Sequence, residues 1–255
     1  MAPDALAVTL TGGPTALLEL GAVRLLVDPT FDPPGEYPLG GGRSLTKTAP
    51  AALDARDLGP VDAVLLSHDQ HPDNLDTAGR AALADAPVVL TTELAAQRLG
   101  GAARALRAGE TAAVGPVQVT GVRAEHGPPG AERLTGPVTG FVLTGEGLPT
   151  VYVSGDNASV DVVRAIAERA GPIELAVLFC GGVSLPHRFD GAYLTLSADA
   201  AAQAAAVLGV RAAVPVHFEG WAHFTQGADE LRSAFAAAGI ADRLVVPERG
   251  GSVSL

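Results

Sequence analysis

Short apolar runs separated by glycine- and proline-rich turns constrain this sequence most. The 255 residues include 31 glycines and 19 prolines, so the chain changes direction often. Strand-like runs dominate the first third, and strand-like and helix-like segments alternate in the second half. This order is typical of a layered α/β protein, and we expect two sheets with helices outside them. No repeat or linker divides the sequence, so residues 1–255 are expected to form a single domain.

The apolar periodicity predicts most elements by residue range. The expected strands are 7–10, 15–20, 23–27, 63–66, 88–90, 117–122, 138–143, 150–153, 175–179, 212–216 and 244–246. The expected helices are 76–84, 93–99, 160–170, 198–208 and 229–238. Residues 30–50 are rich in glycine and proline and predict a long loop, which at this length is more often functional than structural.

Charge and cysteine content exclude several classes of partner. The chain has 28 acidic and 17 basic residues, and its net charge of −11 argues against nucleic acid and anionic membranes as partners. No run of apolar residues is long enough to span a bilayer. Asp4 stands where a secretory signal would be basic, so a cytoplasmic location is expected. Cys180 is the only cysteine, which excludes an intramolecular disulfide and a cysteine-rich zinc module.

All six histidines fall in predicted loops, and most of them directly follow a strand. Loops at strand ends are where binding residues concentrate, because the sheet holds the base of each loop. The six are His68, His71, His126, His187, His217 and His223.

The segment from Leu65 to Asp76 is the most informative. An apolar strand delivers His68, His71 and Asp73 into one short loop before a helix, and imidazole with carboxylate suits zinc or another divalent transition metal. The alternative is that Asp73 or Asn74 caps the following helix while the histidines are solvated.

Three single residues extend this pattern. His126, Asp156 and His217 each follow a strand, although each alone is also compatible with an ordinary loop residue or helix cap.

Other catalytic chemistries have little support in the sequence. The sequence lacks a Gly-x-Ser-x-Gly elbow, a phosphate loop and a GxGxxG motif, and Cys180 is expected to be a buried apolar residue.

In this order, the segments LLVDPTFD, SHDQHPDNLD, EHGPPG, YVSGDN and PVHFEGWAHF resemble hydrolases of the metallo-β-lactamase superfamily. The similarity is greatest to the lactonase-like branch that includes ascorbate-6-phosphate lactonase. The motifs run from Asp28 to His217, so the resemblance covers nearly the whole chain. It implies an α/β fold, an αββα sandwich of two mixed β-sheets flanked by helices, with a metal site at one edge of the sheets.

The resemblance also assigns ligands. His68 matches the first motif histidine and Asp73 the motif aspartate, while His126, Asp156 and His217 match the third imidazole, the bridging carboxylate and the last histidine.

The histidine motif departs from the family pattern HxHxDH. In HDQHPDN one extra residue leaves Gln70 and His71 competing for the second histidine, and Asn74 stands where the last would be. An amide oxygen is a weaker zinc ligand than imidazole, so we expect one tightly bound and one labile metal.

We therefore expect a metal-dependent hydrolase of a small ester, lactone or phosphoester, acting through a metal-bound hydroxide on zinc or manganese. The expected metal ligands are His68, His71, Asp73, His126, Asp156 and His217.

Several further roles follow from this reading. Asp73 is also expected to orient the nucleophile, and His223 or His187 to protonate the leaving group or contact the substrate. Arg188 and Arg43 are candidates for binding an anionic group of the substrate. The alternative is a degenerate member of the same fold that binds metal or ligand without turnover. Gln70 and Asn74 are the features that favour it.

Overall fold

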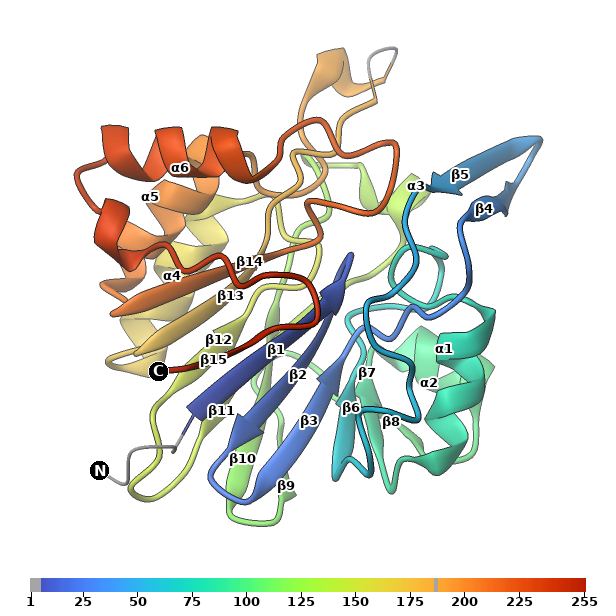
Figure 1. The fold of residues 1–255 in the computed structure, drawn as a ribbon, viewed down its shortest axis with the longest axis horizontal. Helices are drawn as coiled ribbons and strands as arrows, with labels where there is room; N and C mark the ends of the chain where they lie inside the picture. The colour runs from blue at the N-terminus through green and yellow to red at the C-terminus, as the bar shows by residue number, and fades with distance from the viewer. Residues whose placement is uncertain (1–5, 186–187) are drawn as a thin grey trace.

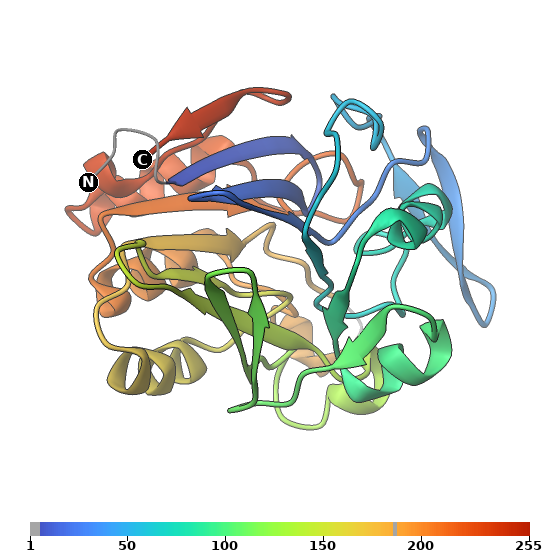
Figure 2. The same cartoon turned by 90° about the horizontal axis from the view of Figure 1, so that it is seen from below.

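Two β-sheets lie face to face between outer layers of helices. The computed structural model describes residues 6–185 and 188–255, and Figure 1 shows α4, α5 and α6 on one side and α1 and α2 on the other. Figure 2 shows the two sheets edge on. Both sheets mix parallel and antiparallel pairs. The expected αββα sandwich is therefore confirmed.

Within the described residues the first sheet has seven strands, in the order β15-β1-β2-β3-β6-β7-β8. Their bounds are β1 Leu6–Gly12, β2 Thr15–Leu20, β3 Val23–Val27, β6 Ala63–Leu65, β7 Val89–Thr91, β8 Ala103–Ala105 and β15 Ser252–Ser254. The second sheet has six described strands, in the order β14-β13-β12-β11-β10-β9. Their bounds are β9 Thr111–Val114, β10 Val117–Arg123, β11 Thr139–Thr144, β12 Val151–Val153, β13 Leu175–Phe179 and β14 Ala212–Val216.

The helices are short, and four of the six described α-helices begin at a side chain that caps them. Their bounds are α1 Thr77–Ala82, α2 Glu93–Leu99, α3 Glu132–Thr135, α4 Val160–Ala170, α5 Ala198–Leu208 and α6 Ala228–Ala237, with 3-10 turns at Leu83–Asp85, Phe189–Gly191 and Ala241–Arg243. Asp76, Thr92, Ser159 and Ser197 each accept a hydrogen bond from the first turn of the helix that follows. Among the helices that the structure describes, none has the length and apolar character needed to cross a bilayer.

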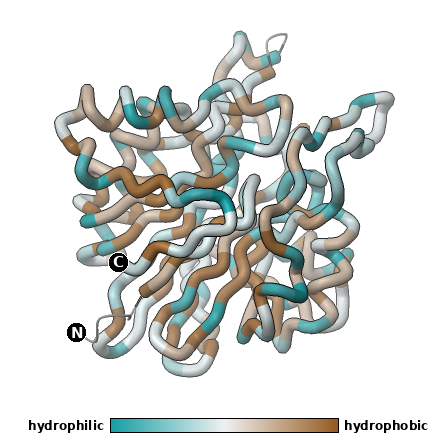
Figure 3. Tube along the Cα trace, in the orientation of Figure 1, coloured by the Kyte–Doolittle hydropathy of each residue, from teal (hydrophilic) through white to brown (hydrophobic). Residues whose placement is uncertain are grey.

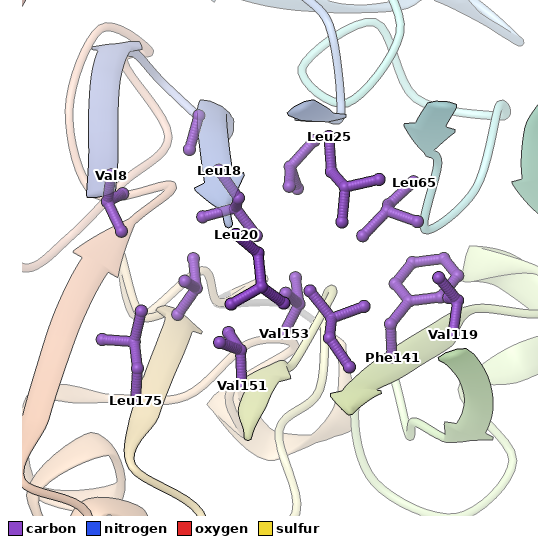
Figure 4. Close-up of a cluster of buried hydrophobic side chains, with 14 of the residues drawn as sticks. Val8, Leu18, Leu20, Leu25, Leu65, Val119, Phe141, Val151, Val153 and Leu175 are labelled. Carbon is purple, nitrogen blue, oxygen red and sulfur yellow. The ribbon is translucent and has the colours of Figure 1, made fainter. Parts of the chain in front are cut away.

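Alternation along the strands builds the core between the sheets. Successive side chains of a strand point to opposite faces, so Leu18 and Leu20 of β2 face the second sheet while Leu17 packs outward. Figure 4 shows this inner cluster, where leucines and valines of one sheet meet Phe141 and Val153 of the other. Burying each such side chain fully contributes about 1.5–3 kcal/mol, so this layer fixes how the sheets face each other.

The outer face of the second sheet is covered by α4, α5 and α6. Tyr152 and Leu178 point outward from the sheet and pack with Ile166 of α4 and Phe235 of α6. In Figure 3 the most hydrophobic segments are largely the central strands. Helix α5 is mainly alanine, and its small side chains are buried against this layer. The first sheet is covered outside by residues around α1 and α2, including Leu75 and Leu83.

The prediction of a loop over residues 30–50 is wrong in part. This segment contains a two-stranded hairpin, β4 Gly35–Gly40 and β5 Arg43–Lys47, which projects from the first sheet in Figure 1. Gly40 to Gly42 form its turn with positive φ angles of 80°, 60° and 73°, a conformation that glycine adopts without steric strain. The sequence pattern missed the hairpin because its strands are exposed on one face and carry Pro38 and two glycines.

Lys47 anchors the base of this hairpin. Its Nζ lies 3.1 Å from Asp76 Oδ2 in the interior, and 5.5 Å from the centre of the Trp221 ring. The backbone of β5 and of the next residue bonds to the loop after β14, through Thr48 N to Gly220 O at 2.8 Å and Ala222 N to Thr46 O at 2.9 Å. The hairpin and that loop are therefore one connected unit.

Smaller differences concern the edges of the sheets. Residues 244–246 form no strand, because only Leu244 pairs with Ala213 in an isolated bridge, and the C-terminal edge strand is β15. The strands β8 and β9 and the short helix α3 were not predicted, since each has only three or four residues. The other predicted helices and strands form within a few residues of their expected bounds.

We predict that Gly79→Ala destabilises the protein, although alanine normally favours a helix interior by about 1 kcal/mol. A Cβ at Gly79 would lie 1.8 Å from the backbone oxygen of Pro29, so α1 would have to move away from the loop that follows β3. Thermal or denaturant unfolding should show a loss of at least about 2 kcal/mol. The exposed control Ala81→Gly, in the same helix, should lose only about 1 kcal/mol. A stabilising Gly79→Ala would contradict this packing.

Candidate metal centre

One edge of the sandwich collects the ends of five strands. β3 and β6 are parallel, as are β12, β13 and β14, and β10 runs in the same direction as β12 because β11 is antiparallel to both. The C-terminal ends of these strands therefore carry their following residues to the same region. The side chains placed there are Asp28 after β3, Ser67 and His68 after β6, His126 after β10, Asp156 after β12 and His217 after β14.

Four of the predicted ligands converge. Ligand atoms of His68, His71, His126 and Asp156 all lie within 4.8 Å of one another. His68 Nε2 is 2.9 Å from His71 Nδ1, and His126 Nε2 is 3.4 Å from the same atom. His126 Nε2 also lies 3.3 Å from Asp156 Oδ2. Three imidazoles and one carboxylate at these separations form a donor set that suits a divalent transition metal.

Hydrogen bonds outside the cluster direct two of these imidazoles. His126 Nδ1 donates to the backbone oxygen of Leu194 at 2.7 Å, which leaves the Nε2 lone pair facing the cluster. His68 Nδ1 lies 2.9 Å from Ser67 Oγ, and that hydroxyl is 2.5 Å from Asp28 Oδ2. With Ser67 donating to the Asp28 carboxylate, His68 Nδ1 donates to Ser67 and the His68 Nε2 lone pair also faces inward. Such outer hydrogen bonds fix the tautomer and orientation of metal-ligating histidines.

A second group of side chains adjoins the first through Asp156. Asp73 Oδ2 lies 3.1 Å from His217 Nε2 and 2.9 Å from His223 Nε2. His217 Nε2 is also 3.6 Å from Asp156 Oδ1, the oxygen opposite the one that faces His126. The two carboxylate oxygens of Asp156 thus face the two groups separately.

Burial and neighbouring charges set the protonation of these groups. Burial, reinforced by His71 and His126, holds the pKa of His68 well below its ordinary value, and burial also lowers the pKa of His71. Both imidazoles are therefore neutral near pH 7, the form that binds a metal. Burial acts to raise the pKa of Asp73, but His223 and His217 outweigh it and hold that pKa well below the usual range. Asp156 and Asp73 raise the pKa of His217 despite its burial.

The residues present fit a metal ion. Among the described atoms, Asp73 Oδ1, His217 Nδ1 and His223 Nδ1 are buried without a hydrogen-bond partner, which is unfavourable in a site that only stabilises the fold. His217 also holds a left-handed backbone with φ of 57°, and Asp28 has φ of 35°. Such conformations in residues other than glycine cluster at functional sites, where the surrounding structure maintains the strain.

The structure distinguishes the alternatives in the histidine motif. His71 enters the cluster, whereas Gln70 turns aside, with its Oε1 accepting from Asp69 N and its Nε2 approaching the backbone oxygen of Thr135. The helix cap is Asp76, which accepts from Gly79 N at 2.8 Å. The alternative that Asp73 or Asn74 caps the helix is therefore wrong.

Asn74 has a role that the sequence did not reveal. Its Nδ2 donates to Asp28 Oδ2 at 3.0 Å and to Asp156 Oδ1 at 3.3 Å, so it bridges two buried carboxylates. Burial raises the pKa of Asp28 to about 7, against the hydrogen bonds from Ser67 that oppose the rise. Ser67 and Asp28 were missed as supporting residues, although LLVDPTFD and the serine before His68 were the available signals.

Of the candidate substrate contacts, some line the cavity above the cluster and others do not. Arg43, from the hairpin, lines the cavity above the cluster, and His223 lines it as well. Arg188 is exposed and does not belong to the cavity lining that the structure describes. His187 lies outside the described residues.

Comparisons with a family model and with related sequences both find metal-dependent hydrolases or their superfamily. A model of the family described as the beta-lactamase superfamily domain matches residues 23–218. A UPF0173 metal-dependent hydrolase of Methanosphaerula palustris is 30% identical, over 97% of this chain and 99% of that protein. One from Pyrococcus abyssi is 26% identical, over 83% of this chain and 84% of that protein.

Solved structures share the fold. The crystal structure of an isothiocyanate hydrolase from Delia radicum gut bacteria has a TM-score of 0.84 at 22% identity, covering 98% of this chain and 99% of its own. The metallo hydrolase Igni18 from Ignicoccus hospitalis has a TM-score of 0.72 at 19% identity, covering 97% of each chain. These likenesses concern the arrangement of the backbone.

We predict that Ser67→Ala weakens metal binding without unfolding the protein. The change removes the hydroxyl between Asp28 and His68, so the ring loses the contact that fixes its tautomer. The metal dissociation constant, measured by competition with a chelator, should rise by about 10- to 100-fold. Ser197→Ala is the matched control, because it removes the cap of α5 and should lower stability by about 1 kcal/mol while leaving metal affinity unchanged. Equal metal affinities for all three proteins would show that Ser67 does not support His68.

Proposed function

The chain belongs to the metallo-β-lactamase superfamily, among the UPF0173 metal-dependent hydrolases, and on that premise we propose that it hydrolyses a small ester, lactone or phosphoester. The observation that carries this proposal is the convergence of His68, His71, His126 and Asp156 beneath an open cavity. We assign these four side chains to one tightly held metal, zinc or manganese. Asp73 and His217, which meet Asp156 from its other side, would hold a second and weaker one.

The reaction uses the residues around the cluster. A divalent ion bound there supplies an acidified water and polarises the bond to be cleaved. Asp73 uses Oδ2 to hold His217 and His223, and within the described structure its Oδ1 has no partner, so Oδ1 is available to orient the attacking water. Neutral His68 and His71 remain available as ligands across the neutral pH range.

The cavity favours a small substrate with an apolar part. Its volume is about 210 Å³, and six of its sixteen described lining residues are aliphatic: Leu39, Leu45, Leu134, Val183, Leu185 and Leu194. Arg43 is the one arginine or lysine among the described lining residues, and it lies on the hairpin. A phosphoester dianion is normally bound by several cationic or N–H donors, whereas an ester or lactone needs less charge. We therefore place lactones and carboxylic esters first and assign Arg43 to a single anionic group of the substrate.

A binding role without turnover is the second candidate. The observation that favours it is Asn74, which stands at a motif position where the family has a histidine and whose side-chain amide donates to the carboxylates of Asp28 and Asp156. The relatives described as metal-dependent hydrolases favour the enzyme. The two candidates differ in one measurable respect, since only the enzyme turns over a substrate when its metal is present.

We predict that protein purified without added metal carries a divalent transition metal, at about one equivalent or more. The convergence of four ligand atoms within 4.8 Å is the reason, and elemental analysis is the measurement. Removal with a chelator should abolish hydrolysis, and adding zinc or manganese should restore it. A content below about a tenth of an equivalent, with no uptake of either metal, would exclude a metal-dependent activity.

We further predict that His126→Ala and Asp156→Asn each lower hydrolysis by at least about 100-fold. His126→Ala removes a donor atom from the cluster, and Asp156→Asn replaces a charged carboxylate by a neutral amide, which is a weaker ligand. The assay uses a panel of lactones, carboxylic esters, phosphoesters and isothiocyanates, with circular dichroism to establish folding. Arg188→Ala, an exposed arginine outside the described cavity lining, is the control and should keep full activity. Unchanged turnover in both cluster variants would assign the activity to another part of the protein.

A further inference from the structure

Next to the first cluster, the side chains of Asp73, His217 and Asp156 form a second set of donor atoms. His223 adds an imidazole to this set that the histidine motif does not predict. We propose that His223 is a metal ligand that completes a second divalent-cation position with Asp73, His217 and Asp156, and that it replaces the motif histidine absent at Asn74. This inference rests on the proposed function only in requiring that the protein bind metal. It concerns which side chain makes the second position complete.

The distances support a common target for these atoms. His217 Nε2 and His223 Nε2 lie 3.1 Å and 2.9 Å from the same oxygen, Asp73 Oδ2. His217 Nε2 is 3.6 Å from Asp156 Oδ1. Two imidazoles from the loop after β14 thus face one oxygen of Asp73, and one of them also approaches Asp156. This donor set is one that zinc and similar ions accept.

Asn74 is a weak candidate for that ligand in this arrangement. Its Nδ2 donates to Asp28 and Asp156, and an amide nitrogen does not coordinate. Its Oδ1 is buried without a hydrogen-bond partner among the described atoms, but a neutral amide oxygen is a weaker zinc ligand than imidazole. Turning the amide over would bring its oxygen against two carboxylates, which is electrostatically unfavourable, so the contacts themselves define the orientation. The side chain at position 74 therefore holds Asp156 in place through Nδ2, and an imidazole from another loop would be the stronger ligand.

The loop that carries His223 is fixed on both sides. Before it, Gly220 and Ala222 bond to the backbone around Lys47 of the hairpin. After it, Thr225 N and Gln226 N both donate to Gly181 O, at 2.9 Å and 3.1 Å. The ring itself packs against Phe224, with ring centres 4.6 Å apart. A side chain held in this way is preorganised, as metal ligands are.

This assignment differs from the role of proton donor expected from the sequence. A proton donor must reach the leaving group of the substrate, whereas His223 Nε2 points at the carboxylate of Asp73. His223 Nε2 is therefore directed toward the proposed cation, and Nδ1 is buried without a hydrogen-bond partner among the described atoms. The His223 side chain is about 20% exposed and lines the cavity. His223 therefore borders both the substrate cavity and the proposed metal position.

The test is the metal stoichiometry of His223→Gln. Glutamine keeps a polar side chain of similar length but is a poor ligand for zinc. Wild-type protein and variant, both as the full chain, are saturated with zinc and dialysed against a fixed low concentration of free zinc. We expect about two equivalents in the wild type and about one in His223→Gln, with the dissociation constant of the second zinc raised by more than about 100-fold.

Two controls make the result specific. Glu219→Gln changes a side chain in the same loop that pairs with Arg249, away from the cluster, and should retain two equivalents. Asn74→His, if it folds, should gain no further metal, because His223 already occupies the role. Two equivalents in His223→Gln, or only one in saturated wild type, would overturn the inference while leaving the hydrolase proposal intact. Absence of any bound metal in wild type would instead overturn the proposed function.

Discussion

Two carboxylates, Asp73 and Asp156, are withdrawn from water at the edge where the sheets meet, and the site is organised around them. An unpaired buried carboxylate is strongly unfavourable, so each must face positive charge, hydrogen-bond donors or a metal. Here the partners are imidazoles from three loops and the amide of Asn74. The strands supply this arrangement because parallel neighbours end at the same edge. The hydrophobic layer between the sheets then holds the strand ends of both sheets in fixed positions at that edge.

Close approach of two loops makes the bridging position of Asp156 available. Gly155 has φ of 56°, and a Cβ there would lie 2.6 Å from the backbone oxygen of Thr139 and 3.0 Å from Ser67 Cβ. Only glycine lets the loop after β12 lie against the loop after β6 in this way. The chain from Asp28 through Ser67 to His68 belongs to one sheet, and Asp156 belongs to the other. The metal centre is thus the point where the two sheets are joined by polar contacts as well as apolar ones.

Sequence reasoning predicted the parts of this protein that depend on local pattern. The αββα layers followed from strand and helix periodicity together with the family resemblance, and the four clustered residues followed from histidines and an aspartate at strand ends. It missed the hairpin over residues 35–47 because the exposed strands alternate weakly and carry glycine and proline. It also left Gln70 and His71 undecided, since the choice depends on contacts with Thr135 and Arg98, which are distant in sequence. The bridge made by Asn74 depends on tertiary contacts in the same way.

The buried ion pair at the base of the hairpin has a practical consequence for solution studies. Lys47 is the only lysine in the sequence, and 4% of its side chain is exposed. Burial lowers the pKa of its amine against the opposing effect of Asp76, and the same burial keeps reagents from the amine while the hairpin is closed. Acylating reagents and lysine-directed cross-linkers will therefore find no other side-chain amine. The rate at which this single amine is modified reports how often the hairpin separates from the body of the protein, without any engineered label.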